Sequence, residues 1–407
     1  MKKFYCQREV AEDPENIRSS LDLSSSQDAR EDGRENIPLT LLKLNVHEAV
    51  PARLKRLRQR LKENNLDSFV TENYANHRYL TGFTGSESWL VVNSQKAYLL
   101  VDSRYTLQAK REVSSEIEVV EIHYFFQDFW HDYAKQFQKT FVGYESKNLT
   151  ADQLSKLKKY SLGLKLIPTE NLVEKLRAVK QPGEMALIKK AVRIADQALE
   201  YIREVIKPGL TEREISWEVE KFCRENGAEK MAWEPVIVAS GENAALPHHK
   251  VSDRKIRQKD MILFDFGAVV EGYHSDVSRV LFVGGVSDEQ RRVYEAVLEG
   301  QKLARDLVCA GVKVSDVDRR VKENLRSRSN GVYGHALGHG LGLEVHEFPV
   351  ISQTREDLLE STNVVTVEPG IYLPEWGGVR IEDVIVVNNA GCETLTRFPK
   401  DLKDVTL

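Results

Sequence analysis

Apolar residues first recur with a regular period near residue 50. Leu54, Leu57 and Leu61 share one face of a predicted helix. Short apolar runs then alternate with helical patterns, and they predict strands at residues 68–71, 89–92, 97–101 and 117–120. Because strands that alternate with helices are typical of an α/β domain, we place such a domain at residues 50–168.

The pattern differs on either side of this domain. Residues 1–49 are polar and lack periodicity, so we expect a disordered or weakly ordered leader there. After residue 168 a helical pattern runs to Lys180, breaks at Gln181-Pro182-Gly183, and resumes from Glu184. Apolar runs at 261–264 and 277–283 flank a turn and predict an antiparallel hairpin. Residues 169–407 therefore predict a second domain, of the α+β class.

Composition and charge exclude several classes of protein. The chain has 407 residues with 58 Lys+Arg against 62 Asp+Glu, a net charge of −4 that does not favour a nucleic-acid binder. We find neither a transmembrane run nor an apolar segment after Met1-Lys2-Lys3 that would make a secretory signal. The four cysteines lie far apart without a CxxC pair, as in reduced cytosolic proteins. We expect a cytoplasmic protein that binds neither membranes nor nucleic acid.

Four acidic residues of the second domain lie in or beside strongly apolar runs, namely Asp265, Asp276, Glu368 and Glu382. A buried ionised carboxylate is costly unless it is paired or bound to a metal. For one such acid, an edge position or a salt bridge is the favoured explanation. For four together, a cation cluster accounts for all of them at once. Two divalent ions would balance four carboxylates, and a bridging hydroxide would add one negative charge.

Histidines cluster in the same domain. His335, His339 and His346 fall within twelve residues, and His248 and His249 form a further pair. The spacing of His335 and His339 matches a helical zinc site, but the HExxH glutamate is missing and Gly338, Gly340 and Gly342 argue against a helix. We therefore predict a turn that leads into a strand. Oxygen ligands with one imidazole suit Mn²⁺, Co²⁺ or Fe²⁺, with Zn²⁺ as an alternative and Mg²⁺ less suited.

These residues stand in five segments whose order along the chain resembles the pita-bread metallopeptidases, specifically aminopeptidase P and prolidase. The segments are residues 263–267, 272–279, 335–347, 366–372 and 379–383. In the first domain, residues 79–86 and 102–105 are also similar to this family. The resemblance covers residues 50–407 and implies a pita-bread catalytic domain preceded by an α/β creatinase-like domain. Methionine aminopeptidases lack that N-terminal domain, and creatinase lacks the metal ligands that this chain retains.

The resemblance also implies a role for each candidate ligand of two divalent ions, with Mn²⁺ favoured. Asp265 would bind one ion, Asp276 and Glu382 would bridge both, and His339 and Glu368 would complete the second. Paired ions lower the pKa of a shared water, and Glu368 would take its proton as ligand and base.

The remaining site residues implied by the resemblance face the substrate. His248 and His346 would contact the peptide and stabilise the transition state, and His335 and Arg380 would support them. The substrate would be a peptide with proline at its second position. The resemblance further implies a homodimer.

Three hypotheses for function remain open. The first is an Xaa-Pro aminopeptidase, because the Xaa-Pro bond is a tertiary amide without an N–H and needs a specialised pocket. The second is an Xaa-Pro dipeptidase (prolidase), which must exclude peptides longer than two residues. The third, from another class, is a non-catalytic peptide-binding module on the same fold.

Overall fold

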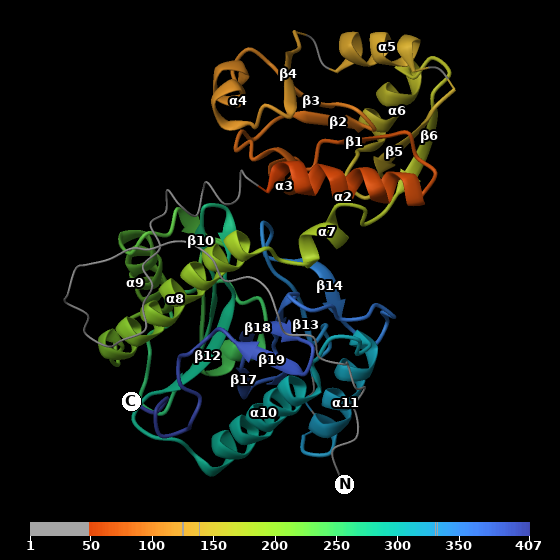
Figure 1. The fold of residues 1–407 in the computed structure, drawn as a ribbon. Coiled ribbons are helices and arrows are strands. Elements are labelled where there is room, and N and C mark those ends of the chain that lie inside the picture. Colours follow the sequence, from red (N-terminus) through yellow and green to blue (C-terminus); the bar gives the residue numbers. More distant parts are fainter. Residues whose placement is uncertain (1–48, 124–125, 138, 330, 332) are drawn as a thin grey trace, which may run out of the picture.

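The computed structural model describes residues 49–407 except 124, 125, 138, 330 and 332, so the predicted leader lies outside the described residues apart from Ala49. The described chain forms two bodies, one above the other in Figure 1. The short helix α7 (Glu174–Ala178) lies between them.

The N-terminal body is a six-stranded mixed sheet in the order β4-β3-β2-β1-β5-β6. β1 pairs antiparallel with β2 and parallel with β5. The strands are β1 (Ser68–Thr71), β2 (Trp89–Asn93), β3 (Ala97–Val101), β4 (Ile117–Glu121), β5 (Phe141–Glu145) and β6 (Lys165–Thr169). The strands predicted at 68–71, 89–92, 97–101 and 117–120 are all present.

Helices cover both faces of this sheet. Since neighbouring strand residues point to opposite sides, each face buries its own set of side chains. Phe69 packs into a core with the leucines of α2, whereas Val70 packs into a second core with Trp130 of α5. The predicted first helix is confirmed, with Leu54, Leu57 and Leu61 on its buried face. The helices are α2 (Val50–Glu63), α3 (Tyr74–Thr81), α4 (Thr106–Glu112), α5 (Gln127–Gln136) and α6 (Ala151–Tyr160).

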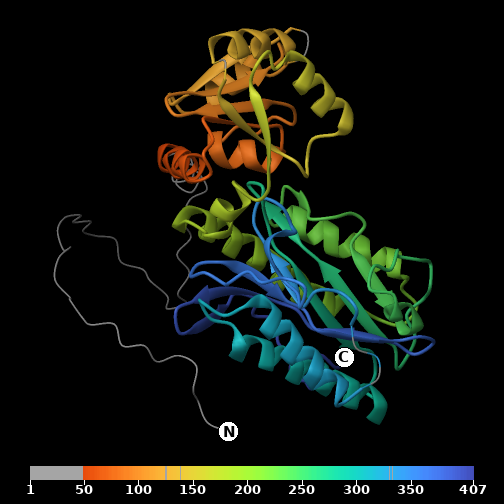
Figure 2. The same cartoon turned by 90° about the vertical axis from the view of Figure 1, so that its right-hand side faces the viewer.

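The C-terminal body places its helices on two sides of its strands (Figure 2). Helices α8 and α9 contact β10 and β8, and helices α10 and α11 contact β19 and β14. After α7, the helices of this body are α8 (Pro182–Val205), α9 (Glu212–Glu225), the 3₁₀ helix η1 (Gly241–Ala245), α10 (Asp288–Leu307) and α11 (Val314–Arg326). The start predicted at Glu184 is wrong by two residues, because Pro182 occupies the first turn and Gln181 forms a capping box with Glu184.

The strands of this body form several antiparallel sheets, of which two carry the candidate site: β12-β9-β8 and β14-β13-β15-β18-β19. The predicted hairpin is confirmed, since β9 pairs with β12 along their whole length. The strands are β7 (Lys230–Met231), β8 (Ile237–Ser240), β9 (Met261–Phe266), β10 (Ala268–Val270), β11 (Tyr273–His274), β12 (Val277–Phe282), β13 (Gly338–Gly340), β14 (Glu347–Ile351), β15 (Val364–Val367), β16 (Gly370–Leu373), β17 (Gly377–Arg380), β18 (Asp383–Asn388) and β19 (Gly391–Thr394).

Two further observations bear on the environment of the chain. Among the described residues, we find no helix whose length and apolar character would let it cross a bilayer. No disulfide links the described cysteines, Cys223, Cys309 and Cys392, to one another.

Candidate metal centre

The acids of the candidate site converge because their strands end, or run side by side, at one place. Asp265 lies within β9, and Asp276 immediately precedes the paired strand β12. Glu382 lies between β17 and β18, and its backbone N–H donates to the carbonyl of Ser278 on β12 at 3.1 Å. Glu368 directly follows β15. Of the four acids found in or beside apolar runs, only Asp265 lies within a strand, and the other three lie at strand ends.

His339 reaches the same place from β13, in the glycine-rich segment. Gly338 and Gly340 belong to this strand, so the segment is not a helix, as predicted, but the turn predicted at these two glycines is wrong because they pair with β14 and β15. A Cβ on Gly338 would lie 2.0 Å from the carbonyl oxygen of Thr366, and one on Gly340 would lie 2.3 Å from that of Phe348. These glycines allow the neighbouring backbones to approach, which brings His339 beside Glu368.

The five predicted ligands form two groups of three residues, and Glu382 belongs to both groups. Within each group, all ligand atoms lie within 4.8 Å of one another: Asp265, Asp276 and Glu382 in one, and His339, Glu368 and Glu382 in the other. His339 Nε2 lies 3.3 Å from Glu368 Oε1 and 3.5 Å from Asp276 Oδ2. Its Nδ1 lies 3.0 Å from the carbonyl oxygen of Gly340, which directs Nε2 toward the carboxylates.

Burial and mutual repulsion shift these carboxyl groups toward their neutral forms. Burial and the charge of Glu382 raise the pKa of Asp276 well above its usual value. Burial and the charge of Glu368 raise the pKa of Glu382 to about 8, and burial raises the pKa of Asp265. Burial also acts on Glu368, but the hydrogen bond and charge of His339 outweigh it and lower that pKa. The chain alone therefore disfavours negative charge on Asp265, Asp276 and Glu382.

The residues present fit a pair of divalent cations. Within the described part of the chain, Asp276 Oδ1 and Glu382 Oε1 are buried and have no hydrogen-bond partner. Buried carboxylate oxygens are rarely left in this state unless an ion or ordered water completes them. Both orphan atoms belong to the two acids that were expected to bridge the ions.

Three polar residues that the sequence reasoning missed hold these ligands in place. Ser278 Oγ donates to Glu382 at 2.7 Å and accepts from Arg380 Nε at 2.7 Å. Thr366 Oγ1 accepts from the backbone N–H of His339 at 3.1 Å. Strand register was the available signal, since Ser278 lies directly opposite Asp265 and so shares its face.

The third missed residue, Tyr372, connects two of the predicted supporting residues. Its hydroxyl accepts from Arg380 at 2.7 Å and lies 3.3 Å from His335 Nε2. Arg380 also donates to Asp265. His335 and Arg380 therefore lie beside the cluster rather than within it, as supporting residues would.

The two histidines predicted to contact substrate are both exposed, unlike the ligands. The His346 ring packs edge-on against His339 with centroids 4.4 Å apart. Its Nδ1 or Nε2 also falls within a group of close ligand atoms with Asp276 and His339. His248 follows Pro247, whose carbonyl oxygen accepts from Arg380 at 3.4 Å. Both imidazoles are thus available to a molecule that enters the site.

Glu212, a further residue that the sequence reasoning missed, anchors the loop that carries His248. This buried carboxylate at the start of α9 accepts hydrogen bonds at 2.6–3.0 Å from the loop, and the donors are the backbone and hydroxyl groups of Ser240 and Ser252 and the side chains of Asn243 and His249. Burial raises its pKa, but these hydrogen bonds outweigh burial and lower the pKa to about 2. A charged Glu212 therefore fixes residues 240–252.

The chain matches two known families along most of its length. Residues 186–389 match metallopeptidase family M24, and residues 53–179 match the creatinase/prolidase N-terminal domain. An Xaa-Pro dipeptidase of Pyrococcus furiosus is 35% identical over 86% of this chain and 99% of its own length.

Solved structures agree with these matches. An Xaa-Pro dipeptidase from Bacillus anthracis superposes with a TM-score of 0.83 at 36% identity, covering 88% of this chain and 100% of that one. An X-Pro aminopeptidase from Thermotoga maritima superposes with a TM-score of 0.79 at 36% identity, covering 87% and 99%. The expected fold, an α/β creatinase-like domain followed by a pita-bread domain, is confirmed.

Proposed function

This chain belongs to metallopeptidase family M24 and carries a creatinase/prolidase N-terminal domain, and we propose that it hydrolyses the bond between an N-terminal residue and a following proline. One observation supports this proposal most. The candidate ligands Asp265, Asp276, His339, Glu368 and Glu382 lie together, with the exposed His248 and His346 beside them. The names of the similar proteins add the Xaa-Pro specificity.

We assign the five clustered residues as ligands of two divalent ions, with Mn²⁺ favoured and Co²⁺, Fe²⁺ or Zn²⁺ as alternatives. When bound, such ions lower the pKa of a shared water and so make a nucleophile available at neutral pH. The two unpartnered oxygens of Asp276 and Glu382 would gain their missing partners when the ions bind.

The side chains of this protein supply the remaining chemistry. The Glu368 carboxylate can accept the proton of the attacking water. It can then return that proton to the proline nitrogen, which has no hydrogen of its own and must gain one to leave. The exposed imidazole of His248 can donate to the carbonyl oxygen as negative charge develops on it. His346 can orient the peptide, and Arg380, Tyr372 and His335 keep Asp265 and the wall of the site in position.

The length of the substrate separates two candidate activities. We propose an Xaa-Pro aminopeptidase that accepts longer peptides. The names of the similar proteins from Pyrococcus furiosus and Bacillus anthracis favour the second candidate, an Xaa-Pro dipeptidase. The homodimer and the cytoplasmic compartment remain predictions.

The proposal is tested with the metal-free and the Mn²⁺-loaded protein on three peptides: an Xaa-Pro dipeptide, an Xaa-Pro-Yaa tripeptide and the matching Xaa-Ala-Yaa tripeptide. We expect Mn²⁺-dependent release of the first residue from the proline peptides alone. Cleavage of the tripeptide supports the aminopeptidase, and cleavage of the dipeptide alone supports the prolidase. Turnover that persists after exhaustive chelation, or equal rates on the alanine peptide, would contradict the proposal. A purified protein that binds less than one ion per chain would favour the non-catalytic module.

A further inference from the structure

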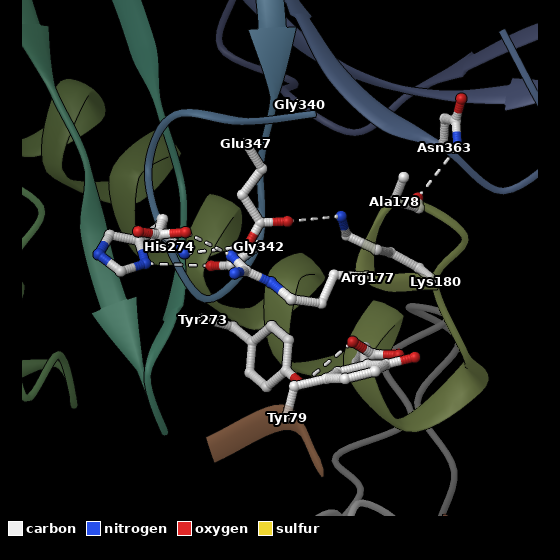
Figure 3. A network of polar contacts seen from close by, with 12 residues as sticks. Tyr79, Arg177, Ala178, Lys180, Tyr273, His274, Gly340, Gly342, Glu347 and Asn363 are labelled. Atoms are coloured by element: carbon white, nitrogen blue, oxygen red, sulfur yellow. Dashed lines mark hydrogen bonds and ion pairs between the residues drawn. The ribbon is translucent and has the colours of Figure 1, made fainter. Parts of the chain in front are cut away.

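The loop that carries His346 ends on a buried carboxylate, that of Glu347, which the proposed chemistry does not use. The Glu347 side chain is 2% exposed and stands at the centre of the polar network in Figure 3. Arg177 donates to its Oε1, Lys180 Nζ donates to its Oε2 at 3.1 Å, and the backbone N–H of Glu344 donates to Oε1 at 3.0 Å. Two cations from the segment between the bodies thus hold the residue next to His346.

The loop itself is folded around this carboxylate. A Cβ on Gly342 would lie 2.7 Å from Glu347 Oε2, so the backbone of the loop touches the side chain that ends it. The carbonyl oxygen of Gly342 in turn accepts from the backbone N–H of His274 at 2.8 Å. His274 is two residues before Asp276. The position of the Glu347 carboxylate therefore fixes the path of residues 342–346 relative to the cluster.

Arg177 extends the same network into the N-terminal body. One of its terminal nitrogens donates to Glu347 and to Glu344 Oε2 at 2.8 Å, and the other donates to Asn76 Oδ1 of α3 at 2.7 Å. Its side chain is 2% exposed. The segment after α7 is fixed separately, since the backbone N–H of Lys180 donates to the carbonyl of Thr362 at 3.2 Å. A single guanidinium thus joins the His346 loop to the N-terminal body.

We propose that Arg177 is a positioning residue that sets the orientation of His346 through Glu347, and that Asn76 ties this orientation to the N-terminal domain. The inference rests on the proposed function, because it assigns Arg177 a part in holding the peptide that His346 contacts. A planar guanidinium can bridge two carboxylates and an amide at fixed angles, which an ammonium group cannot do.

The test compares Arg177→Lys with a matched control, Arg53→Lys. Arg53 is equally buried, and it donates to Gln181 and to the carbonyl of Tyr79 and pairs with Glu184 at 3.3 Å, all outside the His346 loop. Each substitution keeps the positive charge and removes the planar guanidinium with its several N–H donors. We expect Arg177→Lys to lower kcat/KM on the Xaa-Pro peptide roughly 10- to 100-fold through misplacement of the loop. We expect Arg53→Lys to lower thermal stability with little change in kcat/KM.

A double-mutant cycle with His346→Ala shows whether Arg177 acts through His346. If it does, Arg177→Lys changes kcat/KM by about twofold or less in the His346→Ala background. If the losses multiply, Arg177 has a structural role only and the inference is overturned. If Arg177→Lys does not fold, Glu347→Asp takes its place in the cycle. The shorter side chain moves the carboxylate away from the guanidinium of Arg177.

A second readout does not depend on activity. In the metal-free protein labelled with ¹³C at histidine Cε1, the His346 signal is identified by its loss in His346→Ala. We expect this signal to shift in Arg177→Lys and in Asn76→Ala but not in Arg53→Lys. An unmoved His346 signal in Arg177→Lys would overturn the inference even if the wild-type protein cleaved Xaa-Pro peptides. A wild-type protein without Xaa-Pro hydrolysis would instead contradict the proposed function, while the NMR comparison still tests the position of the loop.

Discussion

The C-terminal body buries two sets of carboxylates, and the chain treats them in opposite ways. Asp265, Asp276 and Glu382 of the candidate metal centre have raised pKa values, because burial and neighbouring acids disfavour their charged forms. Glu212 and Glu347 are just as buried, yet their pKa values fall to about 2. Both sets lie in the same domain, so burial alone does not decide the outcome.

Neighbouring cations and hydrogen-bond donors decide whether the pKa of a buried acid is raised or lowered. Burial acts against the charge of Glu347, but Arg177 and Lys180 outweigh it, and hydrogen bonds do the same for Glu212. Asp383, next to Glu382, is also buried and is paired with Arg279 and Lys400, and its pKa is lowered. The chain can therefore compensate a buried acid wherever it builds donors around it. At the candidate metal centre it leaves Asp276 Oδ1 and Glu382 Oε1 without partners, and an external cation would compensate both.

The largest expected effect separates the acid with a chemical task from those that only bind or anchor. Glu368→Gln should lower kcat by about 10²- to 10⁴-fold, because the amide cannot accept the proton of the attacking water. Steady-state kinetics on an Xaa-Pro peptide measures the loss. Metal content and circular dichroism are the controls, since a variant that lost its ions or its fold would give the same loss for another reason. A variant that keeps both and still turns over at the wild-type rate would remove Glu368 from the mechanism.

The next prediction is that replacing an acid by its amide changes the free energy of unfolding in opposite directions at the candidate metal centre and at the anchored acids. In the metal-free protein at neutral pH, Asp276→Asn should raise the free energy of unfolding, because burial and the neighbouring acids disfavour a carboxylate at this position and an amide avoids that cost. Glu347→Gln should lower it by about 3–5 kcal/mol, because Arg177 and Lys180 lose their anion. Urea denaturation with excess chelator measures both values.

Saturation with Mn²⁺ supplies the control for this pair. Ions that bind only the folded chain stabilise it, and the gain should be smaller for Asp276→Asn than for the wild type because a ligand is lost. If Asp276→Asn destabilised the metal-free protein as strongly as Glu347→Gln does, the two sets of acids would not differ in the way described above.

A smaller effect follows from the titration of Glu212. Its pKa is about 2 in the folded chain against an ordinary value of 4.5, so the folded chain binds fewer protons than the unfolded one. This group therefore contributes its full stability, about 3 kcal/mol at most, above the ordinary pKa. The contribution is lost as the pH falls from about 4.5 to about 2. In chelator throughout, the difference in unfolding free energy between wild type and Glu212→Gln should shrink over that range. A difference that stays constant with pH would contradict the assignment.

The comparison also explains which parts of the site could be predicted from the sequence. Asp265, Asp276 and Glu382 stand beside apolar runs, so the conflict between charge and burial is visible locally. Glycines 338 and 340 exclude a helix at His339 for an equally local reason. Four of the six strands of the N-terminal domain, β1 to β4, are short apolar runs that were predicted for the same reason, whereas β5 and β6 were not predicted.

Residues whose importance depends on distant partners could not be found in this way. Glu212 follows Thr211 at a helix start, where an acid is ordinary, and nothing in the neighbouring residues shows that a loop closes over it. Glu347 and Arg177 are 170 positions apart. Tyr372 matters because its hydroxyl meets His335 and Arg380, which only the folded chain brings together. The start of α8 was misplaced because Pro182 was taken as a breaker although it suits the first turn.

The smallest expected effect tests whether burial is needed for any of these differences. Glu393 on β19 pairs with Lys189 at 3.1 Å, but both side chains are about half exposed, at 52% and 47%. Water and salt screen such a pair, so Glu393→Gln should change the free energy of unfolding by about 0.5 kcal/mol or less, with or without metal. Urea denaturation under the conditions used for Asp276→Asn and Glu347→Gln measures it. A change as large as that of Glu347→Gln would show that loss of any paired acid destabilises this domain, and burial would then not be the cause of the contrast between the anchored acids and the metal centre.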